Sequence, residues 1–366
     1  MSATTRILLC AAISMAISNL ASAENWTRFR GPNGQGISTE KNLPTTWSAD
    51  ENVVWKASIP GKGWSSPIVY KDKVFVTTAT EEGVSCRILC VNRKDGSIAW
   101  NTEVHRQKPG PMRQQNSYAT PTPVTDGERV YSVFYDGTVA AVDFSGKPVW
   151  KSQEVKFFSL HGLGASPLLA QGQLIMPYDG SSREESRVGW KEPWKNAVIL
   201  SLDAATGAVK WKGKRGESRV GHVTPILLGD GEQFVSAGGD RVQGHDAQTG
   251  KQVWSIYSQG EGVTPSPVIG DGLIYTSSGI RSPNDSGNST RRKGRHHRDA
   301  HRLGAEERRP GPGITALCRP LPLHDFARQH PALHRSVDRR DHLAGATDRS
   351  AFCVTGVCRW KNLRAV

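Results

Sequence analysis

The chain has 366 residues and a mass of 39.9 kDa, enough for two average domains or one large repeat architecture. Hydrophobic residues make up 37%, charged residues 22%, and the mean hydropathy is −0.47, which excludes a polytopic membrane protein and a wholly disordered chain. The net charge of +13 is uneven, because residues 1–280 carry 29 Lys/Arg against 26 Asp/Glu and residues 281–366 carry 18 against 8. The basic character therefore belongs to the C-terminal part.

Residues 1–23 have the pattern of a secretory signal peptide. Arg6 supplies a positive start, residues 7–17 form an apolar run, and the ASA sequence at 21–23 fits a cleavage site. The run is too short to span a bilayer comfortably, and a buried core helix is the alternative. The pattern predicts an exported protein, periplasmic or secreted, with no transmembrane segment after signal removal.

The cysteines do not form a disulfide scaffold. Cys86 and Cys90 lie on one strand-like segment, and four residues along a strand span ~13 Å, beyond the reach of a disulfide. Both side chains would face the same side of the strand. We expect them to be buried as small apolar residues.

Residues 51–280 repeat two short patterns. In the first, a small residue and Pro precede a few apolar residues, a polar turn and a strand; it occurs at Ser66-Pro67, Thr120-Pro121, Ser166-Pro167, Thr224-Pro225 and Ser266-Pro267. The second ends in Trp, at Trp100, Trp150, Trp211 and Trp254. Hairpin-turn residues precede these tryptophans, among them Asp203, Thr206 and Gly207, and Asp246, Thr249 and Gly250.

The spacing of the repeat predicts a β-propeller. Successive Pro or Trp positions lie 42 to 61 residues apart, which suits a four-stranded blade. One twisted sheet cannot bury both faces, so blades must stack radially with Trp side chains between them. Trp55 ends a strand pattern with no Ser-Pro half, and in a closed ring it would complete the last blade. We expect an N-terminal extension at 24–50, then about four blades and part of a fifth.

The D-x-x-T-G-x-x-x-W repeats resemble the quinoprotein-type (PQQ-like) β-propeller family over residues 50–280, and the sequence WTRFRGPNGQGIS at 26–38 resembles exported bacterial members. This family contains quinone-dependent alcohol and sugar dehydrogenases and the non-enzymatic propeller subunit of the outer-membrane β-barrel assembly machinery. The resemblance implies the fold much more strongly than any chemistry.

The dehydrogenase branch of this family typically has a vicinal Cys-Cys pair and Glu, Asn and Asp ligands for Ca²⁺, whereas this chain has no adjacent cysteines. No Ser/His/Asp set, phosphate-binding loop or metal-ligand spacing stands out. A turn role is favoured for three aspartates, Asp203, Asp240 and Asp246. Three histidines could face the central channel, although a packed or hydrogen-bonded role is favoured: His161, His222 and His245.

These observations predict no catalytic, cofactor-binding or metal site. We expect a non-catalytic propeller that acts as a scaffold for an unidentified protein or cell-envelope partner. The alternative is a degenerate or truncated quinone-dependent dehydrogenase, which would bind PQQ with Ca²⁺.

Residues 281–366 depart abruptly from the repeat. A disordered basic arm and a nucleic-acid-binding tail are two interpretations, and a shifted reading frame is the favoured third. With each codon shifted by one base, the tail can encode D-x-x-T-G-x-x-x-W and A-S-P-V-x-x-D-G-K-I-Y-V in the order of the upstream repeat. Trp360-Lys361 then permits only Gly, and Lys361-Asn362 only Lys or Arg. A frameshift after residue 280 explains the excess of Arg and His without a nucleic-acid partner.

Overall fold

The computed structural model describes residues 24–114, 116–185, 187–216, 218–229, 231–239, 241–257, 264–270, 273–276 and 318–320. The expected signal peptide and nearly all of the basic tail lie outside these residues. The described part is built from β-strands, with one short 3-10 turn at Glu81–Gly83. None of its helices is long and apolar enough to cross a membrane.

Four antiparallel sheets of four strands follow one another along the chain, each with its strands in sequential order. The first contains β1 (Ile68–Tyr70), β2 (Lys73–Thr80), β3 (Ser85–Asn92) and β4 (Ile98–Arg106). The second contains β5 (Val124–Thr125), β6 (Arg129–Val133), β7 (Val139–Asp143) and β8 (Pro148–Ser152). The third contains β9 (Leu168–Ala170), β10 (Gln173–Tyr178), β11 (Val198–Asp203) and β12 (Val209–Lys214). The fourth contains β13 (Ile226–Leu227), β14 (Gln233–Ala237), β15 (Arg241–Asp246) and β16 (Gln252–Tyr257).

A fifth sheet begins in the same way but continues differently. β17 (Val268–Gly270) and β18 (Leu273–Thr276) form an antiparallel hairpin, and β19 (Cys318–Pro320) then pairs with β18 in parallel. In the other four sheets every neighbouring pair is antiparallel. The all-β fold with four blades and part of a fifth is therefore confirmed, and the blade pattern changes where the sequence repeat stops.

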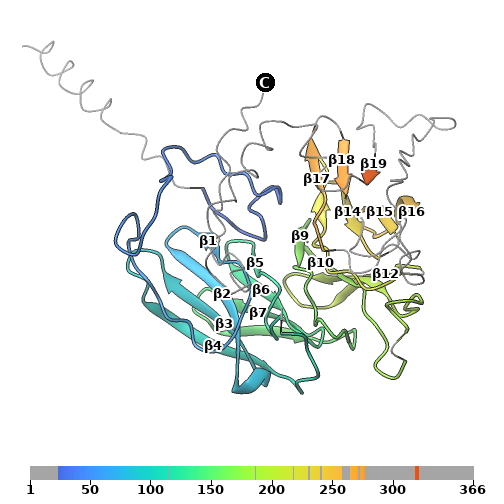
Figure 1. The fold of residues 1–366 in the computed structure, drawn as a ribbon, viewed down its shortest axis with the longest axis horizontal. Coiled ribbons are helices and arrows are strands. Elements are labelled where there is room, and N and C mark those ends of the chain that lie inside the picture. The colour runs from blue at the N-terminus through green and yellow to red at the C-terminus, as the bar shows by residue number, and fades with distance from the viewer. Residues whose placement is uncertain are drawn as a thin grey trace, which may run out of the picture.

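The hydrophobic core lies between the blades, which follow one another around an arc (Figure 1). Phe75 of the first blade packs in one cluster with Phe134 of the second, and Tyr131 of the second packs in another with Tyr178 of the third. Two further clusters join the third blade to the fourth and the fourth to the fifth. Cys86 and Cys90 are free, buried members of the first cluster, as expected.

Three of the four repeat tryptophans reach across to the next blade. The Trp150 indole covers Gly207, whose added Cβ would lie 2.5 Å from the ring, and its Nε1 donates to the Ala204 carbonyl at 2.9 Å. Trp100 covers Gly146 in the same way and donates to the Phe144 carbonyl at 3.0 Å, whereas Trp211 covers Gly250 with no hydrogen-bond partner for its Nε1 among the described residues. These glycines have φ between +71° and +88°, so both conformation and contact exclude a side chain. We call each pair a Trp–Gly dock.

Trp55 makes a Trp–Gly dock although no blade precedes it. Residues 53–59 form no strand, so the expected outer strand at Trp55 is not formed. Its indole nevertheless covers Gly96 of the first blade, and its Nε1 donates to the Arg93 carbonyl at 2.7 Å. Trp55 therefore occupies the position that the tryptophan of a preceding blade would take.

The aspartates of the repeat shape the turns that carry these glycines. Asp203 Oδ1 accepts hydrogen bonds from the backbone N–H and hydroxyl of Thr206 at 2.9 and 3.0 Å. Asp246 is bonded in the same way by Thr249, at 2.7 Å for both donors. The threonine hydrogen bonds lower the pKa of both aspartates. Asp240 lies outside the described residues.

A chain of hydroxyl groups joins the innermost strands. Ser66 N–H donates to Thr122 Oγ1 at 2.9 Å, Thr122 N–H to Ser166 Oγ at 3.0 Å, and Ser166 N–H to Thr224 Oγ1 at 2.9 Å. The second unit of the Pro repeat is thus Thr122-Pro123, and the sequence-based choice of Thr120-Pro121 is wrong. The TPTP sequence offers two matches, and β5 starts directly after Pro123.

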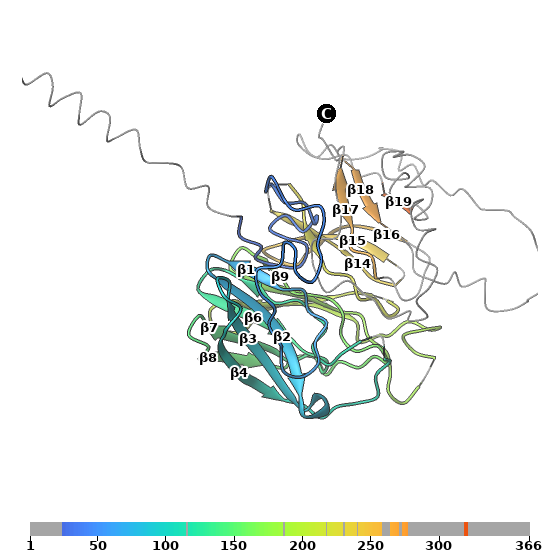
Figure 2. The ribbon, with the colours of Figure 1, turned by 60° about the vertical axis from the view of Figure 1, so that its left-hand side comes forward.

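The N-terminal segment at 24–36 crosses the inner edges of the blades (Figures 1 and 2, dark blue). Trp26 pairs with Val69 of β1, and the Thr27 carbonyl accepts from Thr125 N–H of β5 at 3.0 Å. Gln35 Oε1 accepts from Ile269 N–H of β17 at 2.9 Å. The segment therefore connects the first and second sheets to the fifth, near the ends where β1, β5 and β17 turn into their neighbours.

The Trp–Gly dock makes a specific prediction about two glycines. Gly172→Ala should cost about 1–2 kcal/mol, because Gly172 has φ +71° but open space around it. Gly207→Ala should cost about 2–5 kcal/mol, because the new Cβ must also displace Trp150. Urea unfolding of the two variants measures the difference. Equal losses of stability would contradict a packing role for the dock.

Candidate interaction face

One end of the blade array carries all of its long connections. Because the strands of each sheet run in alternating directions, the links between second and third strands and the links between blades emerge at the same end. We define this loop face by residues 107–123, 153–167, 179–197 and 215–225. The short turns of the Trp–Gly docks lie at the opposite end.

A buried ion pair fixes the loop face between the third and fourth blades. Arg215, at the end of β12, donates from Nε and Nη2 to the two carboxylate oxygens of Asp179 at 2.9 and 2.8 Å. Arg215 Nη1 donates to Gln243 Oε1 of β15 at 3.1 Å, and Ser218 Oγ donates to Asp179 at 2.9 Å. Arg215 and Asp179 are 0% and 2% exposed. A buried pair with every partner satisfied is costly to break, by about 3–5 kcal/mol when one member is removed.

A second carboxylate joins the first two blades. Asp136, in the β6–β7 turn, is bound by His105 Nε2 of β4 at 2.8 Å and accepts from Thr138 N–H at 3.0 Å and Gln153 Nε2 at 3.0 Å. Burial raises the pKa of Asp136, but the hydrogen bonds from His105 and Thr138 outweigh it, so the net shift is downward. The buried carboxylate of Asp179 and the partly buried carboxylate of Asp136 are thus both hydrogen-bonded to neighbouring side chains.

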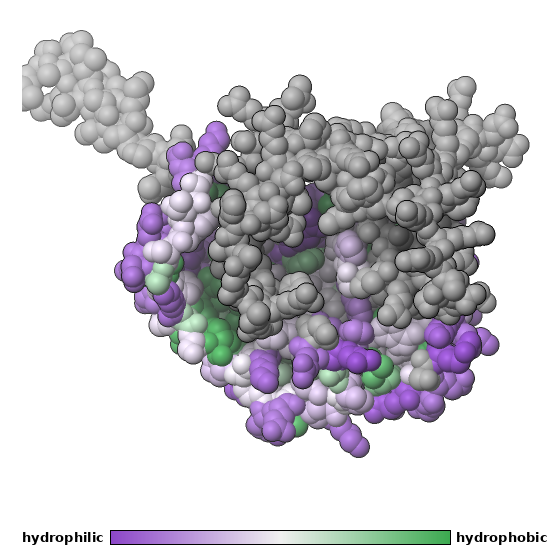
Figure 3. All heavy atoms as spheres, in the orientation of Figure 1, coloured by the Kyte–Doolittle hydropathy of each residue, from purple (hydrophilic) through white to green (hydrophobic). Residues whose placement is uncertain are grey.

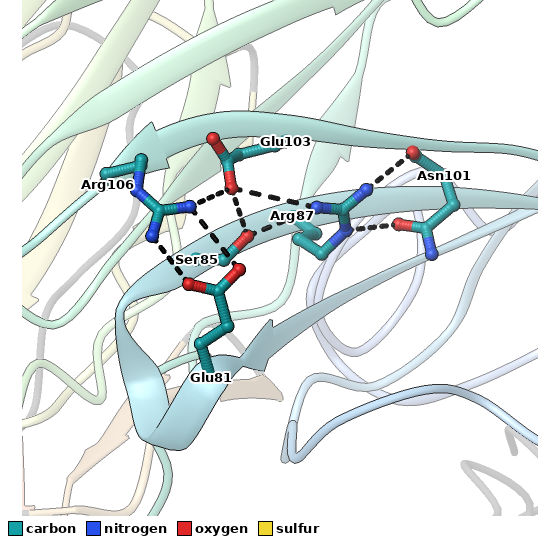
Figure 4. A network of polar contacts seen from close by, with 6 residues as sticks. All are labelled: Glu81, Ser85, Arg87, Asn101, Glu103 and Arg106. Carbon is teal, nitrogen blue, oxygen red and sulfur yellow. Dashed lines mark hydrogen bonds and ion pairs between the residues drawn. The ribbon is translucent and has the colours of Figure 1, made fainter.

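An exposed polar network at the edge of the first blade contrasts with these buried pairs (Figure 4). Arg106 contacts Glu81 and Glu103, while Arg87 donates to the Asn101 side chain at 2.7 Å. Arg106 is 53% exposed in its side chain. Solvent-exposed pairs of this kind contribute about 0–1 kcal/mol. The exposed pairs of this network therefore add little to the stability of the first blade.

Two of the three singled-out histidines come together. The rings of His161 and His222 lie 6.0 Å apart edge to face, and His161 also lies 5.3 Å from the ring of Trp190. The three residues come from three different connections of the loop face. His245 is elsewhere, inside β15, stacked on Phe234 at 5.1 Å with Nδ1 against the Gly250 carbonyl at 3.1 Å. This is the packed, hydrogen-bonded role that the sequence favours for His245, and the alternative of a ring facing the channel does not apply to it.

His222 has unusual surroundings. The residue is partly exposed, but both of its ring nitrogens are buried and neither has a hydrogen-bond partner among the described residues. Its ring lies against Gly164. Burial and the nearby His161 lower the pKa of His222 to about 4. Burial and Arg113 also lower the pKa of His161. The cluster therefore presents two neutral imidazoles and an indole, which can stack on a planar group and exchange hydrogen bonds with it.

Sequence patterns could single out the histidines but not Trp190 or the Asp179–Arg215 pair. Trp190 lies outside the repeat, and Asp179 and Arg215 carry no motif. Their meeting depends on long connections whose path is fixed only in the folded chain. Among the residues that the structure describes, no group of three or more His, Cys, Asp or Glu side chains could hold a metal ion.

The neutral His222 predicts a pH dependence of stability. The pKa of His222 is lower in the folded chain than in the unfolded chain. Between about pH 6.5 and pH 4 the unfolded chain therefore binds a proton that the folded chain does not, and the free energy of unfolding decreases as the pH is lowered. At pH 5.5 the free energy of unfolding should be lower than at pH 7.5 by about 1.4 kcal/mol from this residue alone. The His222→Gln variant should not show this loss of about 1.4 kcal/mol. Between pH 7.5 and 8.5 the free energies of unfolding of the variant and the parent should change with pH in the same way. Identical pH profiles in urea melts would contradict a neutral His222 with buried ring nitrogens.

Comparison with known proteins shows which protein family the repeat belongs to. The model of a family described as outer membrane protein assembly factor BamB matches residues 37–153 and 195–291, more than half of the chain. The outer membrane protein assembly factor BamB of Bordetella pertussis is 27% identical over 159 residues, which are 42% of this chain and 35% of that protein. The chain thus spans about a third of the length of this curated relative.

Solved propeller structures resemble this chain in fold, at low sequence identity. A europium-containing methanol dehydrogenase is 13% identical with a TM-score of 0.45, covering 64% of this chain and 49% of its own. BamB from Moraxella catarrhalis is 16% identical with a TM-score of 0.35, covering 62% of this chain and 72% of its own. The match of the family model over most of the blade repeats identifies the chain as a member of the outer membrane protein assembly factor BamB family of PQQ-like β-propellers.

Proposed function

We propose that this chain is an exported, non-catalytic propeller that acts as a protein-interaction scaffold at the cell envelope. The observation that carries the proposal is the family match together with the apolar surface of one segment. The curated relative from Bordetella pertussis is named as an assembly factor for outer membrane proteins, and this name is consistent with a scaffold role.

The apolar surface is concentrated in residues 37–64. Of the large hydrophobic side chains exposed in the described structure, six lie in this stretch: Ile37, Leu43, Trp47, Val53, Val54 and Trp64. Val54 is 89% exposed. Figure 3 shows hydrophobic surface on the side of the molecule where the first blade lies. Clustered exposed apolar residues, with tryptophans among them, are typical of protein-binding surfaces.

The remaining exposed apolar residues are isolated from one another. The outer strand of each complete blade carries one of them, namely Ile98, Val149, Val209 and Val253. Single exposed apolar side chains are ordinary on a protein surface. They therefore serve as matched controls for the 37–64 segment.

The quinone-dependent dehydrogenase remains the competing function, and we propose that the chain uses no PQQ. Asp136 and Asp179 are already bound by His105 and Arg215. Cys86 and Cys90 are separate, buried residues of β3, and burial raises the pKa of Cys90 to about 11. These placements favour a scaffold over a redox site.

Site-specific photo-crosslinking in the cell envelope tests the scaffold function. A crosslinking residue at Val54 should give discrete adducts with a component of the outer membrane protein assembly machinery, whereas the same residue at Val209 should give none. Equal crosslinking at both positions would contradict a specific surface. A rise in melting temperature with PQQ and Ca²⁺, accompanied by alcohol-dependent dye reduction, would support the dehydrogenase instead.

A further inference from the structure

The N-terminal segment carries one buried arginine, Arg28, and one partly buried arginine, Arg30. Arg28 is 7% exposed, and its Nε donates to the Gly31 carbonyl at 3.2 Å. Burial lowers the pKa of Arg28 to about 10 and also lowers that of Arg30. Arg30 Nη2 reaches only the Gln35 carbonyl, at 3.4 Å. Both guanidinium groups are thus held close to the backbone of the same short loop.

No counter-charge accompanies these arginines. Among the residues that the structure describes, neither Arg28 nor Arg30 forms an ion pair with a carboxylate. The acidic residue of the same segment, Glu24, is engaged by Ser38 Oγ at 2.8 Å and Thr39 N–H at 3.0 Å. Buried charges in proteins are normally paired, because an unpaired buried charge is strongly unfavourable. The contrast with Arg215, which has a complete set of partners, is plain.

An unsatisfied donor lies in the same loop. Gln35 uses Oε1 to accept from Ile269 N–H, but its Nε2 is buried with no hydrogen-bond partner among the described residues. Gly34 precedes Gln35 and lies directly against Nη2 of Arg28, where an added Cβ would collide with the guanidinium. The loop therefore holds two guanidinium groups without a carboxylate and one amide N–H group without an acceptor.

The backbone holds this arrangement in place. Arg30 has φ +61°, an uncommon value for a residue with a side chain, and Gly31, Gly34 and Gly36 have φ between +69° and +80°. Gly36 N–H donates to the Arg30 carbonyl at 2.7 Å. The pairing of Trp26 with β1 and of Gln35 with β17 fixes the two ends of the loop. A loop tied at both ends can keep donors in position before a ligand arrives.

We propose that Arg28, Arg30 and Gln35 form an oxyanion-binding site, for the carboxylate or phosphate group of a ligand, where residues 24–36 cross the inner edges of the blades. Two guanidinium groups and one amide supply N–H donors, and the anion supplies the missing acceptors and the missing negative charge. This site is independent of the scaffold surface at 37–64 and of the histidines on the loop face.

Calorimetric titration of the full chain tests the site, with inorganic phosphate in one arm and succinate in the other, at an ionic strength held constant with sodium chloride. One anion should bind and raise the melting temperature, which also identifies the source of the oxyanion. Arg28→Gln should weaken this binding at least tenfold. Lys41→Gln, which removes an exposed charge from the same extension, should leave it unchanged.

Gln35→Glu provides a second test that does not depend on removing an arginine. The new carboxylate would sit beside the two guanidinium groups and act as a built-in counter-ion. This variant should melt at a higher temperature than the parent without added anion and should lose the anion-dependent shift. The proposal is overturned if neither anion binds the parent chain, if Arg28→Gln binds as tightly, or if Gln35→Glu melts at a lower temperature.

Discussion

The structure depends on one repeated contact, in which a tryptophan indole covers a glycine of the following blade, as Trp100, Trp150 and Trp211 do. The glycine must have a positive φ and no side chain. Trp150 and Gly207 show the geometry, with the Trp150 Nε1 bound to the Ala204 carbonyl. The contact couples neighbouring sheets at their outer strands, while the hydroxyl chain through Thr122 and Ser166 couples them at the inner strands. Blades fixed at both edges bury a hydrophobic cluster between them.

Local features of the chain made the blades predictable. The D-x-x-T-G turn, the tryptophan and the alternating strands lie within one blade, and their spacing repeats, so the sequence predicts both fold and blade number. The start of the second blade could not be assigned from local sequence, because Thr120-Pro121 and Thr122-Pro123 have the same pattern. Only the hydrogen bond from Ser66 N–H, a residue of another blade, distinguishes them.

The candidate sites were harder to predict because they depend on contacts between distant segments. The His161–His222 pair needs the path of two inter-blade connections, and the buried state of Arg28 needs strands up to β17. A sequence pattern records neither path. The two ends of the blade array therefore differ in kind. The loop face holds hydrogen-bonded carboxylates and neutral imidazoles, whereas residues 24–36 hold two arginines without a carboxylate partner among the described residues.

Trp55 shows most clearly how the dock works apart from its blade, since it covers Gly96 from a segment that forms no strand. Native-state amide exchange of β3 and β4 in Trp55→Ala, compared with Trp47→Ala, tests the central claim directly. Trp47 is a 46% exposed tryptophan of the same segment. The account predicts that Trp55→Ala lowers the protection of the first blade by about 2–4 kcal/mol and that Trp47→Ala changes it by less than about 0.5 kcal/mol. Equal protection of the first blade in the two variants would contradict it.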